Sequence, residues 1–258
     1  MIDLKNVSYE TNSRELFSDV SFAINAGDKI GLVGPNGAGK TTLLKIINGD
    51  IQPTSGDIIS SGEEIGILPQ NLNKWLDKTV YDFIEEVTGV KSAREEFDYQ
   101  CERLTQEASE KTLLIYGEAL ERYEKFEVAN FDTTIKKALS RADLGDIDPD
   151  RRLNTFSGGQ HTRIALAAVF ASRYDLILLD EPTNNLDDSG VILLEDFIDN
   201  SSASFLIVSH DRHFLRNTAE RIIELTGGKG VNKYNLGYDE YIEARREARQ
   251  AMTDRYEQ

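Results

Sequence analysis

The sequence has 258 residues, of which 40% are hydrophobic and 29% are charged, a balance that is typical of soluble globular proteins and argues against a disordered chain. Its formal net charge of −16 repels phosphate backbones, so we do not expect this segment alone to bind nucleic acid nonspecifically. No run approaches the roughly 20 apolar residues that cross a bilayer, no secretion signal is recognisable, and a single cysteine excludes an internal disulfide, so we expect a cytoplasmic protein without an integral membrane segment.

The N-terminal third of the chain reads as strands followed by a helix. Residues 2–9 and 16–25 alternate apolar and polar side chains, which predicts two strands of a half-solvated antiparallel sheet. Residues 29–33 form a short apolar run that ends in a glycine-rich turn, and residues 41–48 follow with helical spacing. A strand, a glycine-rich loop and a helix in this order provide the context that a phosphate loop requires.

The loop between this strand and helix matches the phosphate-loop pattern, because residues 34–41 read Gly-Pro-Asn-Gly-Ala-Gly-Lys-Thr. Its glycines let successive backbone N–H groups face the phosphates, and the N-terminus of the following helix adds a positive dipole end. We expect Lys40 to reach the β- and γ-phosphates and the Thr41 hydroxyl to ligate Mg²⁺. The predicted nucleotide-binding residues of this loop are Gly34, Asn36, Gly37, Ala38, Gly39, Lys40, Thr41 and Thr42.

Two further short strands are predicted near 57–60 and 64–68, and the composition then changes from about residue 80 to 145. Apolar residues recur at spacings of three and four from Phe97 to Ala108 and again from Leu113 to Tyr123. The polar segment between these two stripes predicts an antiparallel helical hairpin with its break at residues 109–112.

The charge of this helical region is strongly acidic. Residues 84–127 hold twelve Asp or Glu against six Lys or Arg. We interpret these charges as the solvated surface of a helical subdomain rather than as a specific binding site. Cys101 lies within the region, and we expect a buried structural thiol.

The second half of the chain alternates helices with short apolar strands. A helix is predicted over 158–171 and another over 189–199, while strands are predicted at 176–179 and 204–208. Buried strands that alternate with helices favour a parallel sheet covered on both faces, and therefore an α/β fold.

Two carboxylates, Asp180 and Glu181, end the apolar strand at 176–179. We expect Asp180 to hold Mg²⁺ through water, as the second half of the metal site of phosphate-loop nucleotidases. We expect Glu181 to polarise the attacking water as a general base. A helix N-cap would explain one of these acids, but hardly both.

Residues 156–160, Phe-Ser-Gly-Gly-Gln, resemble the signature motif of ATP-binding cassette (ABC) proteins. The resemblance implies the P-loop ABC ATPase fold, with a mostly parallel core sheet, an antiparallel N-terminal subdomain and a helical subdomain. It also implies that two cassettes sandwich two ATP molecules, so that one cassette's signature motif binds the γ-phosphate held by the other. The residues expected to act in trans in this way are Ser157, Gly158, Gly159, Gln160 and, in the loop that crosses the dimer interface, Asp187.

Three further motifs of the family are each matched by a single residue. Tyr9, 25 residues before the phosphate loop, resembles the aromatic residue that stacks on adenine, although a tyrosine packed into the core explains the position nearly as well. Gln70 resembles the glutamine that senses Mg²⁺ and the attacking water, which implies a catalytic and metal-binding role. His210 follows a buried strand and resembles the switch histidine that contacts the γ-phosphate.

The domain organisation follows from the same comparison. Residues 1–238 are expected to form the ABC ATPase domain, with the helical subdomain and an arm-like hairpin at about 80–172. Residues 239–258 contain six acids and four arginines but few large apolar residues, which predicts a helix that is polar nearly all round. This helix resembles the start of an interdomain linker.

Two segments, 183–187 and 209–215, are similar to the ABC-F branch of the family, whose members carry two cassettes in one soluble chain. The resemblance implies an N-terminal cassette whose partner is a second cassette of the same full-length chain, or a second copy of this chain. It also implies a ribosome-bound translation factor or antibiotic-resistance protein. The alternative is the ATPase subunit of a membrane transporter. A DNA-maintenance clamp would need a longer coiled coil than the hairpin here.

Overall fold

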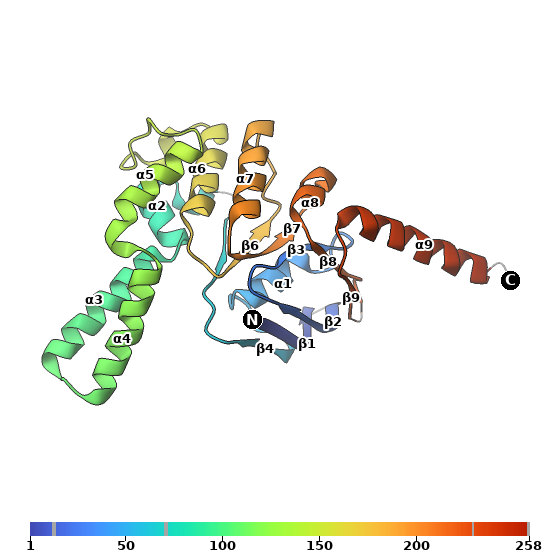
Figure 1. The fold of residues 1–258 in the computed structure, drawn as a ribbon, viewed down its shortest axis with the longest axis horizontal. Coiled ribbons are helices and arrows are strands. Elements are labelled where there is room, and N and C mark those ends of the chain that lie inside the picture. Colours follow the sequence, from blue (N-terminus) through green and yellow to red (C-terminus); the bar gives the residue numbers. More distant parts are fainter. Residues whose placement is uncertain (12–13, 70–71, 229, 257–258) are drawn as a thin grey trace. The chain divides into compact units, whose positions relative to one another are not determined.

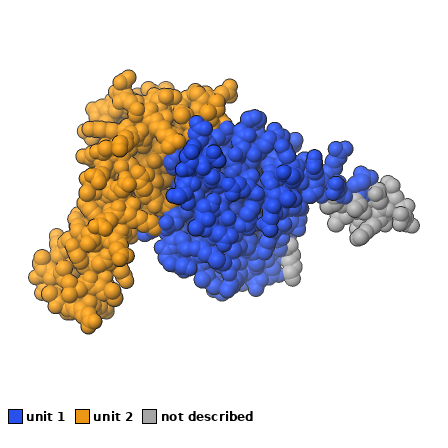
Figure 2. All heavy atoms as spheres, viewed as in Figure 1, with its two compact units in different colours: residues 1–67, 175–184, 194–258 blue, residues 68–174, 185–193 orange. Residues whose placement is uncertain are grey.

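The computed structural model describes residues 1–11, 14–69, 72–228 and 230–256. The chain forms two compact units, which are coloured separately in Figure 2. Unit 1 comprises Met1–Ile67, Asp175–Asn184 and Leu194–Gln258, and unit 2 comprises Leu68–Tyr174 and Asn185–Leu193. In the part of the chain that is described, no helix combines the length and the apolar character that a membrane span requires.

Unit 1 contains a three-stranded antiparallel sheet, which confirms the sheet predicted from the alternating apolar and polar residues near the N-terminus. Its strands are β1 (Ile2–Thr11), β2 (Arg14–Ile24) and β4 (Ser55–Ser60), in the order β2-β1-β4. Strand β1 pairs with β2 so that Ile2 lies opposite Ile24. The alternating side chains place one apolar face of this sheet against the core.

The second sheet of unit 1 has six strands in the order β5-β6-β7-β3-β8-β9 (Figure 1). Its strands are β3 (Lys29–Val33), β5 (Ile65–Ile67), β6 (Leu176–Asp180), β7 (Ser204–Val208), β8 (Arg221–Leu225) and β9 (Val231–Tyr234). All neighbours pair in parallel except β8 and β9, which are antiparallel. The predicted parallel sheet is therefore confirmed, and its carboxyl ends meet along one edge, where α/β proteins place their ligands.

Helix α1 (Lys40–Ile47) lies in the apolar layer shared by the two sheets of unit 1. Its buried Leu43 and Leu44 pack with alternate residues of β6, including Leu176 and Leu178. The intervening residues of the strands face the opposite side, where Phe197 of helix α7 (Asp188–Asn200) contacts Phe205 with ring centroids 6.2 Å apart. This double burial explains why β6 and β7 read as continuous apolar runs.

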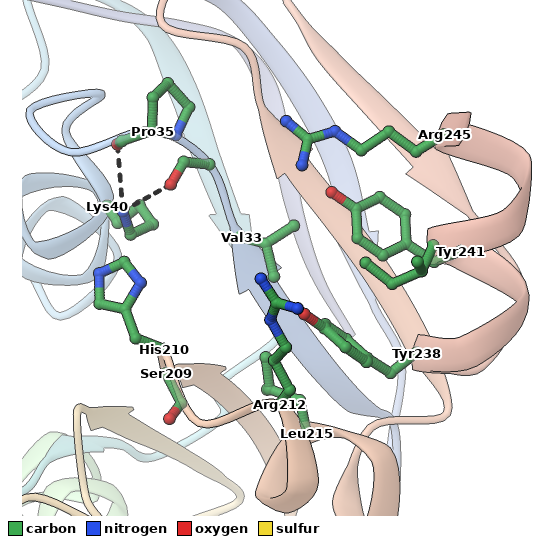
Figure 3. Close-up of a pocket in the computed structure, with 12 residues that line it drawn as sticks. Val33, Pro35, Lys40, Ser209, His210, Arg212, Leu215, Tyr238, Tyr241 and Arg245 are labelled. Carbon is green, nitrogen blue, oxygen red and sulfur yellow. Dashed lines mark hydrogen bonds between the residues drawn. The ribbon is translucent and has the colours of Figure 1, made fainter. Parts of the chain in front are cut away.

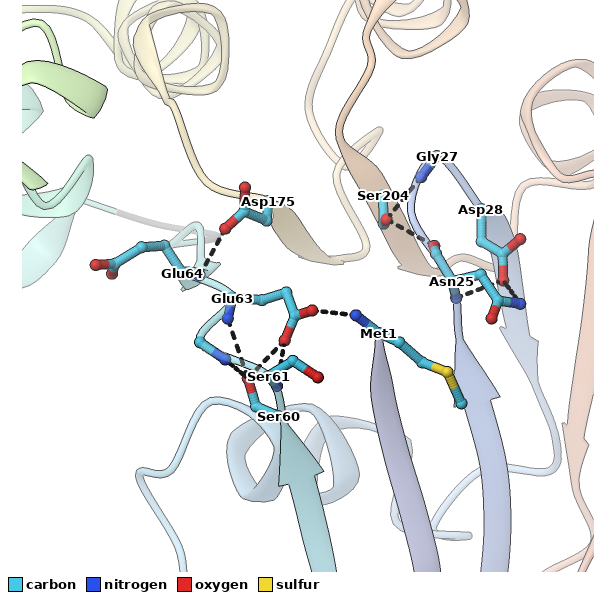
Figure 4. A network of polar contacts seen from close by, with 11 residues as sticks. Met1, Asn25, Gly27, Asp28, Ser60, Ser61, Glu63, Glu64, Asp175 and Ser204 are labelled. Atoms are coloured by element: carbon cyan, nitrogen blue, oxygen red, sulfur yellow. Dashed lines mark hydrogen bonds and ion pairs between the residues drawn. The ribbon is translucent and has the colours of Figure 1, made fainter. Parts of the chain in front are cut away.

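Polar contacts tie together the amino ends of the parallel strands, away from the carboxyl edge (Figure 4). The backbone N–H of Glu64 donates to Asp175 at 2.7 Å, and Ser204 accepts from the N–H of Gly27 at 3.0 Å. The N-terminal ammonium of Met1 pairs with Glu63. This hydrogen bond is the main cause that lowers the pKa of Glu63 to about 2.

Helix α9 (Tyr238–Tyr256) is not polar on every side, which corrects the sequence-based prediction for its first turns. Tyr238 and Tyr241 are 8% and 2% exposed, because they pack on unit 1. The Tyr241 hydroxyl donates to the buried carboxylate of Glu224 on β8 at 3.2 Å, and Arg245 forms an ion pair with the same carboxylate at 2.9 Å. The start of α9 is therefore docked on the sheet by a buried polar cluster.

We predict that Tyr241→Phe lowers the free energy of unfolding by about 1 kcal/mol, the usual net value of one intramolecular hydrogen bond. Burial and the neighbouring Glu224 raise the pKa of Tyr241, so the phenol stays protonated and donates at neutral pH. Chemical denaturation followed by circular dichroism measures the change. The matched control is Tyr238→Phe on the same helix, because no hydrogen bond of Tyr238 is found among the described residues. Equal effects of both substitutions would contradict the prediction.

Unit 2 is helical. Its helices are α2 (Val80–Val87), α3 (Val90–Gln106), α4 (Glu110–Lys125), α5 (Phe131–Arg141) and α6 (Gly158–Ala171). Helices α3 and α4 lie side by side as a hairpin (Figure 1), which confirms the predicted hairpin. The break between them is shorter than expected, because Ser109 and Thr112 form a capping box that begins α4.

The hairpin is held by aromatic contacts rather than by the complete predicted stripe. The ring of Phe97 lies 4.5 Å from that of Tyr123 and 5.7 Å from that of Tyr116, measured between centroids. Leu113, by contrast, is 54% exposed. Cys101 is only half-buried and not fully buried as expected.

Candidate functional site

The phosphate loop joins β3 to α1 in unit 1, and its backbone requires glycine at two positions. Gly34 has a φ of 152°, and a Cβ there would lie 2.4 Å from the carbonyl oxygen of Leu225. Gly39 has a φ of 93°, and a Cβ there would lie 2.7 Å from the ring of Phe17. Side chains are therefore excluded at both positions, which leaves the loop backbone free to face a ligand.

Lys40 is buried within this loop, with 9% of its surface exposed. Its ammonium donates to the carbonyl oxygens of Gly34 at 2.9 Å and Pro35 at 3.1 Å (Figure 3). Burial lowers the pKa of Lys40, while the carboxylates of Glu181 and Asp180 act in the opposite direction. The loop therefore holds the ammonium of Lys40 on two carbonyl oxygens, next to the backbone that an anionic ligand would face.

Thr41 and Asp180 bring two oxygen atoms together from α1 and β6. The Thr41 hydroxyl donates to the carboxylate of Asp180 at 2.7 Å, and Asp180 is 8% exposed. Among the described residues, no group of three or more His, Cys, Asp or Glu is suited to hold a metal. A hydroxyl and a carboxylate fit Mg²⁺, because this ion keeps several waters and takes other ligands from substrate phosphates. The third predicted metal residue, Gln70, lies outside the described residues.

Glu181 and His210 meet at the carboxyl ends of β6 and β7. Glu181 has a left-handed φ of 50°, which is uncommon for a non-glycine residue, and its backbone N–H donates to Val208 at 2.8 Å. Its carboxylate accepts from the backbone N–H of His210 at 3.2 Å, and the His210 Nε2 lies 3.6 Å from Glu181 Oε1. The structure thus brings together the predicted general base and the predicted switch histidine. A strained backbone at such a position is typical of functional sites.

Tyr9 is half-buried on β1, where it packs against the core of unit 1. Its ring centroid lies 6.4 Å from that of Phe17, the residue whose ring closes over Gly39. Phe17 therefore contacts both Tyr9 and Gly39 of the phosphate loop. Its stacking on adenine stays a prediction.

The residues predicted to act in trans gather in unit 2 at the start of α6. Ser157 is the N-cap of α6, and its hydroxyl accepts from the backbone N–H of Gln160 at 3.3 Å. A cavity of about 340 Å³ opens here and is lined by Ser157, Gly159, Gln160, Thr162, Arg163, Asn185, Leu186 and Asp187. The signature segment and the loop that contains Asp187 therefore share one hollow within unit 2.

Arg163 is the residue of this hollow that the sequence interpretation missed. Its guanidinium donates to both carboxylate oxygens of Asp187, at 2.6 and 2.7 Å, and to Asp143 at 3.0 Å. The hydrogen bond from Arg163 is the main cause that lowers the pKa of Asp187. Arg163 was visible as the one Lys or Arg of the predicted helix 158–171, but its partner lies 24 residues away in sequence.

We predict that Arg163→Gln raises the pKa of Asp187 toward the ordinary aspartate value, because its main hydrogen-bond donor is lost. The depressed pKa means that this pair stabilises the folded chain above the ordinary aspartate pKa. That contribution disappears as the pH falls through the lowered value. Carboxyl-detected NMR titration of Asp187 measures the shift. The control is Arg173→Gln, which removes an ion pair with Glu127 elsewhere in unit 2. An unchanged pKa of Asp187 in Arg163→Gln would refute the assignment.

A model of the family described as "ABC transporter" matches residues 17–184. This match covers the phosphate loop, the signature segment and the Asp180-Glu181 pair, and more than half of the chain. The chain therefore belongs to this family and is an ABC ATPase cassette.

Within the family, the curated relatives that match the chain include ABC-F proteins. The chain is 35% identical, over its whole length, to the tylosin resistance ATP-binding protein TlrC of Streptomyces fradiae, of which it covers 48%. It is 34% identical over 95% of its length to the energy-dependent translational throttle protein EttA of Mycobacterium tuberculosis, covering 44% of it. ABC transporter F family member 5 of Arabidopsis thaliana is 31% identical over 93% of the chain and 36% of the relative. The chain thus spans about half the length of the first two of these relatives and about a third of the last.

Solved structures of ABC cassettes share the fold. The dimeric post-hydrolysis structure of the cassette MJ0796 bound to ADP and Pi aligns with a TM-score of 0.63 at 24% identity, covering 92% of this chain and all of that one. A nucleotide-free cassette of an ABC transporter aligns with a TM-score of 0.60 at 19% identity, covering 91% of both chains. At these identities the likeness shows the fold alone, and the predicted α/β ABC ATPase fold is confirmed.

Proposed function

We propose that this cassette binds ATP with Mg²⁺ at the phosphate loop and hydrolyses it once a second cassette completes the site. The observation that carries the proposal is the cluster in unit 1 that combines a buried lysine in a glycine loop, the Thr41–Asp180 pair and the Glu181–His210 pair. These groups supply a cation for the phosphates, oxygens for the metal and a base for water. Phosphoryl transfer needs this combination.

The residues of the site divide the tasks of the proposed reaction among them. Lys40 and the loop amides bind the β- and γ-phosphates, and Thr41 and Asp180 hold Mg²⁺, which neutralises charge on the phosphates when bound. Glu181 orients the attacking water and takes its proton, while His210 contacts the γ-phosphate. Gln70 is proposed to sense the metal and the water, and Tyr9 to stack on adenine.

A second cassette is proposed to complete the site through its own signature segment. By symmetry, Ser157, Gly158, Gly159, Gln160 and Asp187 of this chain act on the nucleotide of the partner. Hydrolysis removes the anion that both cassettes grip, which weakens the interface and opens the pair. The partner is either a second cassette of a longer chain, with residues 239–258 as the start of the linker, or another copy of this chain.

For the whole protein we propose a ribosomal role in the cytoplasm. Two of the similar proteins carry names that concern tylosin resistance and translation. The net charge of −16 implies that most contacts with ribosomal RNA are made outside this cassette. The description of the matched family supports the second candidate, the ATPase subunit of a membrane transporter.

Sedimentation separates the two candidates. We expect the protein that carries this cassette, with the substitution Glu181→Gln, to co-sediment with ribosomes in the presence of ATP, because the pair of cassettes stays closed when hydrolysis stops. The double variant Lys40→Ala/Glu181→Gln is the control, since it lacks the nucleotide contact. If neither variant co-sediments with ribosomes, the ribosomal role is contradicted and the transporter subunit is favoured.

A further inference from the structure

A cavity of about 280 Å³ adjoins the phosphate loop within unit 1 (Figure 3). One wall is the loop and the residues that follow β7, and the other is formed by helix α8 (Arg212–Thr218) and the start of α9. The lining includes the polar residues Lys40, His210, Arg212, Tyr238, Tyr241 and Arg245. The volume is far above that of a single water molecule, so the cavity has room for a small polyatomic ligand.

The lining of this cavity is cationic, although the chain as a whole carries a net charge of −16. Lys40, Arg212 and Arg245 line it together with the imidazole of His210, and no carboxylate is among the described residues of the lining. The hydroxyl of Tyr238, which lies beside Arg212 in Figure 3, adds a neutral hydrogen-bonding group. Such a set of groups selects an anion that accepts several hydrogen bonds.

The two arginines of the lining differ in whether they already have an acidic partner. Arg212 is exposed on α8, and among the described residues it forms neither a hydrogen bond nor an ion pair. Arg245 pairs through its Nε with Glu224, which does not line the cavity. The Glu224 contact therefore fixes the side chain of Arg245 and leaves its two Nη groups as donors.

We propose that this cavity holds orthophosphate, the product of ATP hydrolysis, after it has left the position of the γ-phosphate. The inference rests on the proposed function, because Lys40 and His210, to which we assign the γ-phosphate, line the same cavity. Water attacks the γ-phosphorus, the bond to the β-phosphate oxygen breaks, and ADP and orthophosphate result. The freed anion then lies between the phosphate loop and the two arginines, on its way to solvent.

The location of the cavity gives phosphate release a structural consequence. Tyr238, Tyr241 and Arg245 belong to α9, so a phosphate bound to Arg212 and Arg245 bridges α8 and α9. Departure of the anion removes this bridge. Helix α9 therefore senses the product, in addition to its docking through Glu224.

The test is calorimetric titration of the chain, loaded with ADP and Mg²⁺, with inorganic orthophosphate. We expect saturable binding that weakens about tenfold or more in Arg212→Gln, because a hydrogen bond between charged groups is lost. Arg245→Gln weakens it similarly, and Arg212→Lys restores part of the affinity. Arg246→Gln is the matched control, because Arg246 is exposed on α9 and does not line the cavity. Thermal unfolding of each variant verifies that the fold is intact.

Each outcome decides the matter. Equal orthophosphate affinity in the wild type and in Arg212→Gln would overturn the proposal, as would the absence of any orthophosphate binding to the ADP-loaded chain. Binding of a short uridine oligonucleotide, but not of orthophosphate, would also overturn it, since the cations would then serve a nucleic acid. Failure of ADP itself to bind would instead contradict the proposed function, so the two failures are distinguishable.

Discussion

Glu181→Gln is expected to stop ATP hydrolysis in the assembled pair of cassettes and to leave ATP binding intact. An amide has the shape of the carboxylate but cannot take the proton of the attacking water. A positioned general base contributes about 10²- to 10⁴-fold to the rate, so turnover should fall by that factor. Binding is preserved because the phosphates contact the loop and the metal rather than this residue.

Single-turnover hydrolysis and equilibrium binding of a fluorescent ATP analogue measure the two effects separately. The control is Glu220→Gln, which removes an exposed carboxylate that lies 3.9 Å from Lys29 and outside the site. Unchanged turnover in Glu181→Gln would show that another group accepts the proton. Loss of binding together with turnover would show that Glu181 has a structural role instead.

Lys40→Ala is expected to weaken ATP binding by about 100-fold, because hydrogen bonds to charged groups are the strongest that the loop can offer. Burial lowers the pKa of Lys40, so the folded chain disfavours its charged form. Its hydrogen bonds to the carbonyl oxygens of Gly34 and Pro35 act in the opposite direction. We therefore expect only a small change in the unfolding temperature of the variant.

The matched control is Lys45→Ala, which removes an exposed lysine from the same helix α1. Fluorescence titration with an ATP analogue compares the three proteins, and calorimetric scanning gives their unfolding temperatures. Equal ATP affinity in Lys40→Ala and Lys45→Ala would show that Lys40 of the phosphate loop does not bind the nucleotide. A large drop in the unfolding temperature of Lys40→Ala would contradict the electrostatic argument.

The features that sequence alone predicted are those with a local cause. Helix α6 begins and ends where expected, because Ser157 caps it and its apolar face is continuous up to Ala171. Strands β6 and β7 were predictable from their unbroken apolar runs, which follow from burial on both faces. The loop at residues 34–41 was predictable because glycine is required at single positions of it: a side chain at Gly34 or Gly39 would clash with neighbouring atoms.

The features that escaped prediction depend on partners distant in the sequence. Helix α9 looked polar because two tyrosines supply its buried side, and Glu224, the hydrogen-bond partner of Tyr241, lies on β8, which the sequence did not single out. Arg163 was not predicted as a site residue for the same reason, because its partner Asp187 lies in a separate loop. The pattern of residues within a segment predicts which element that segment forms, whereas polar pairs between segments follow only from the tertiary arrangement.

Calorimetric titration of the wild-type chain with ATP, ADP and AMP in the presence of Mg²⁺ tests whether the phosphate loop binds a nucleoside triphosphate. We expect one saturable site that binds ATP and ADP, and much weaker binding of AMP, because the loop amides, Lys40 and the metal oxygens act on the β- and γ-phosphates. The absence of saturable ATP binding, or AMP binding as tight as that of ATP, would refute the assignment of the phosphate loop as the ATP site.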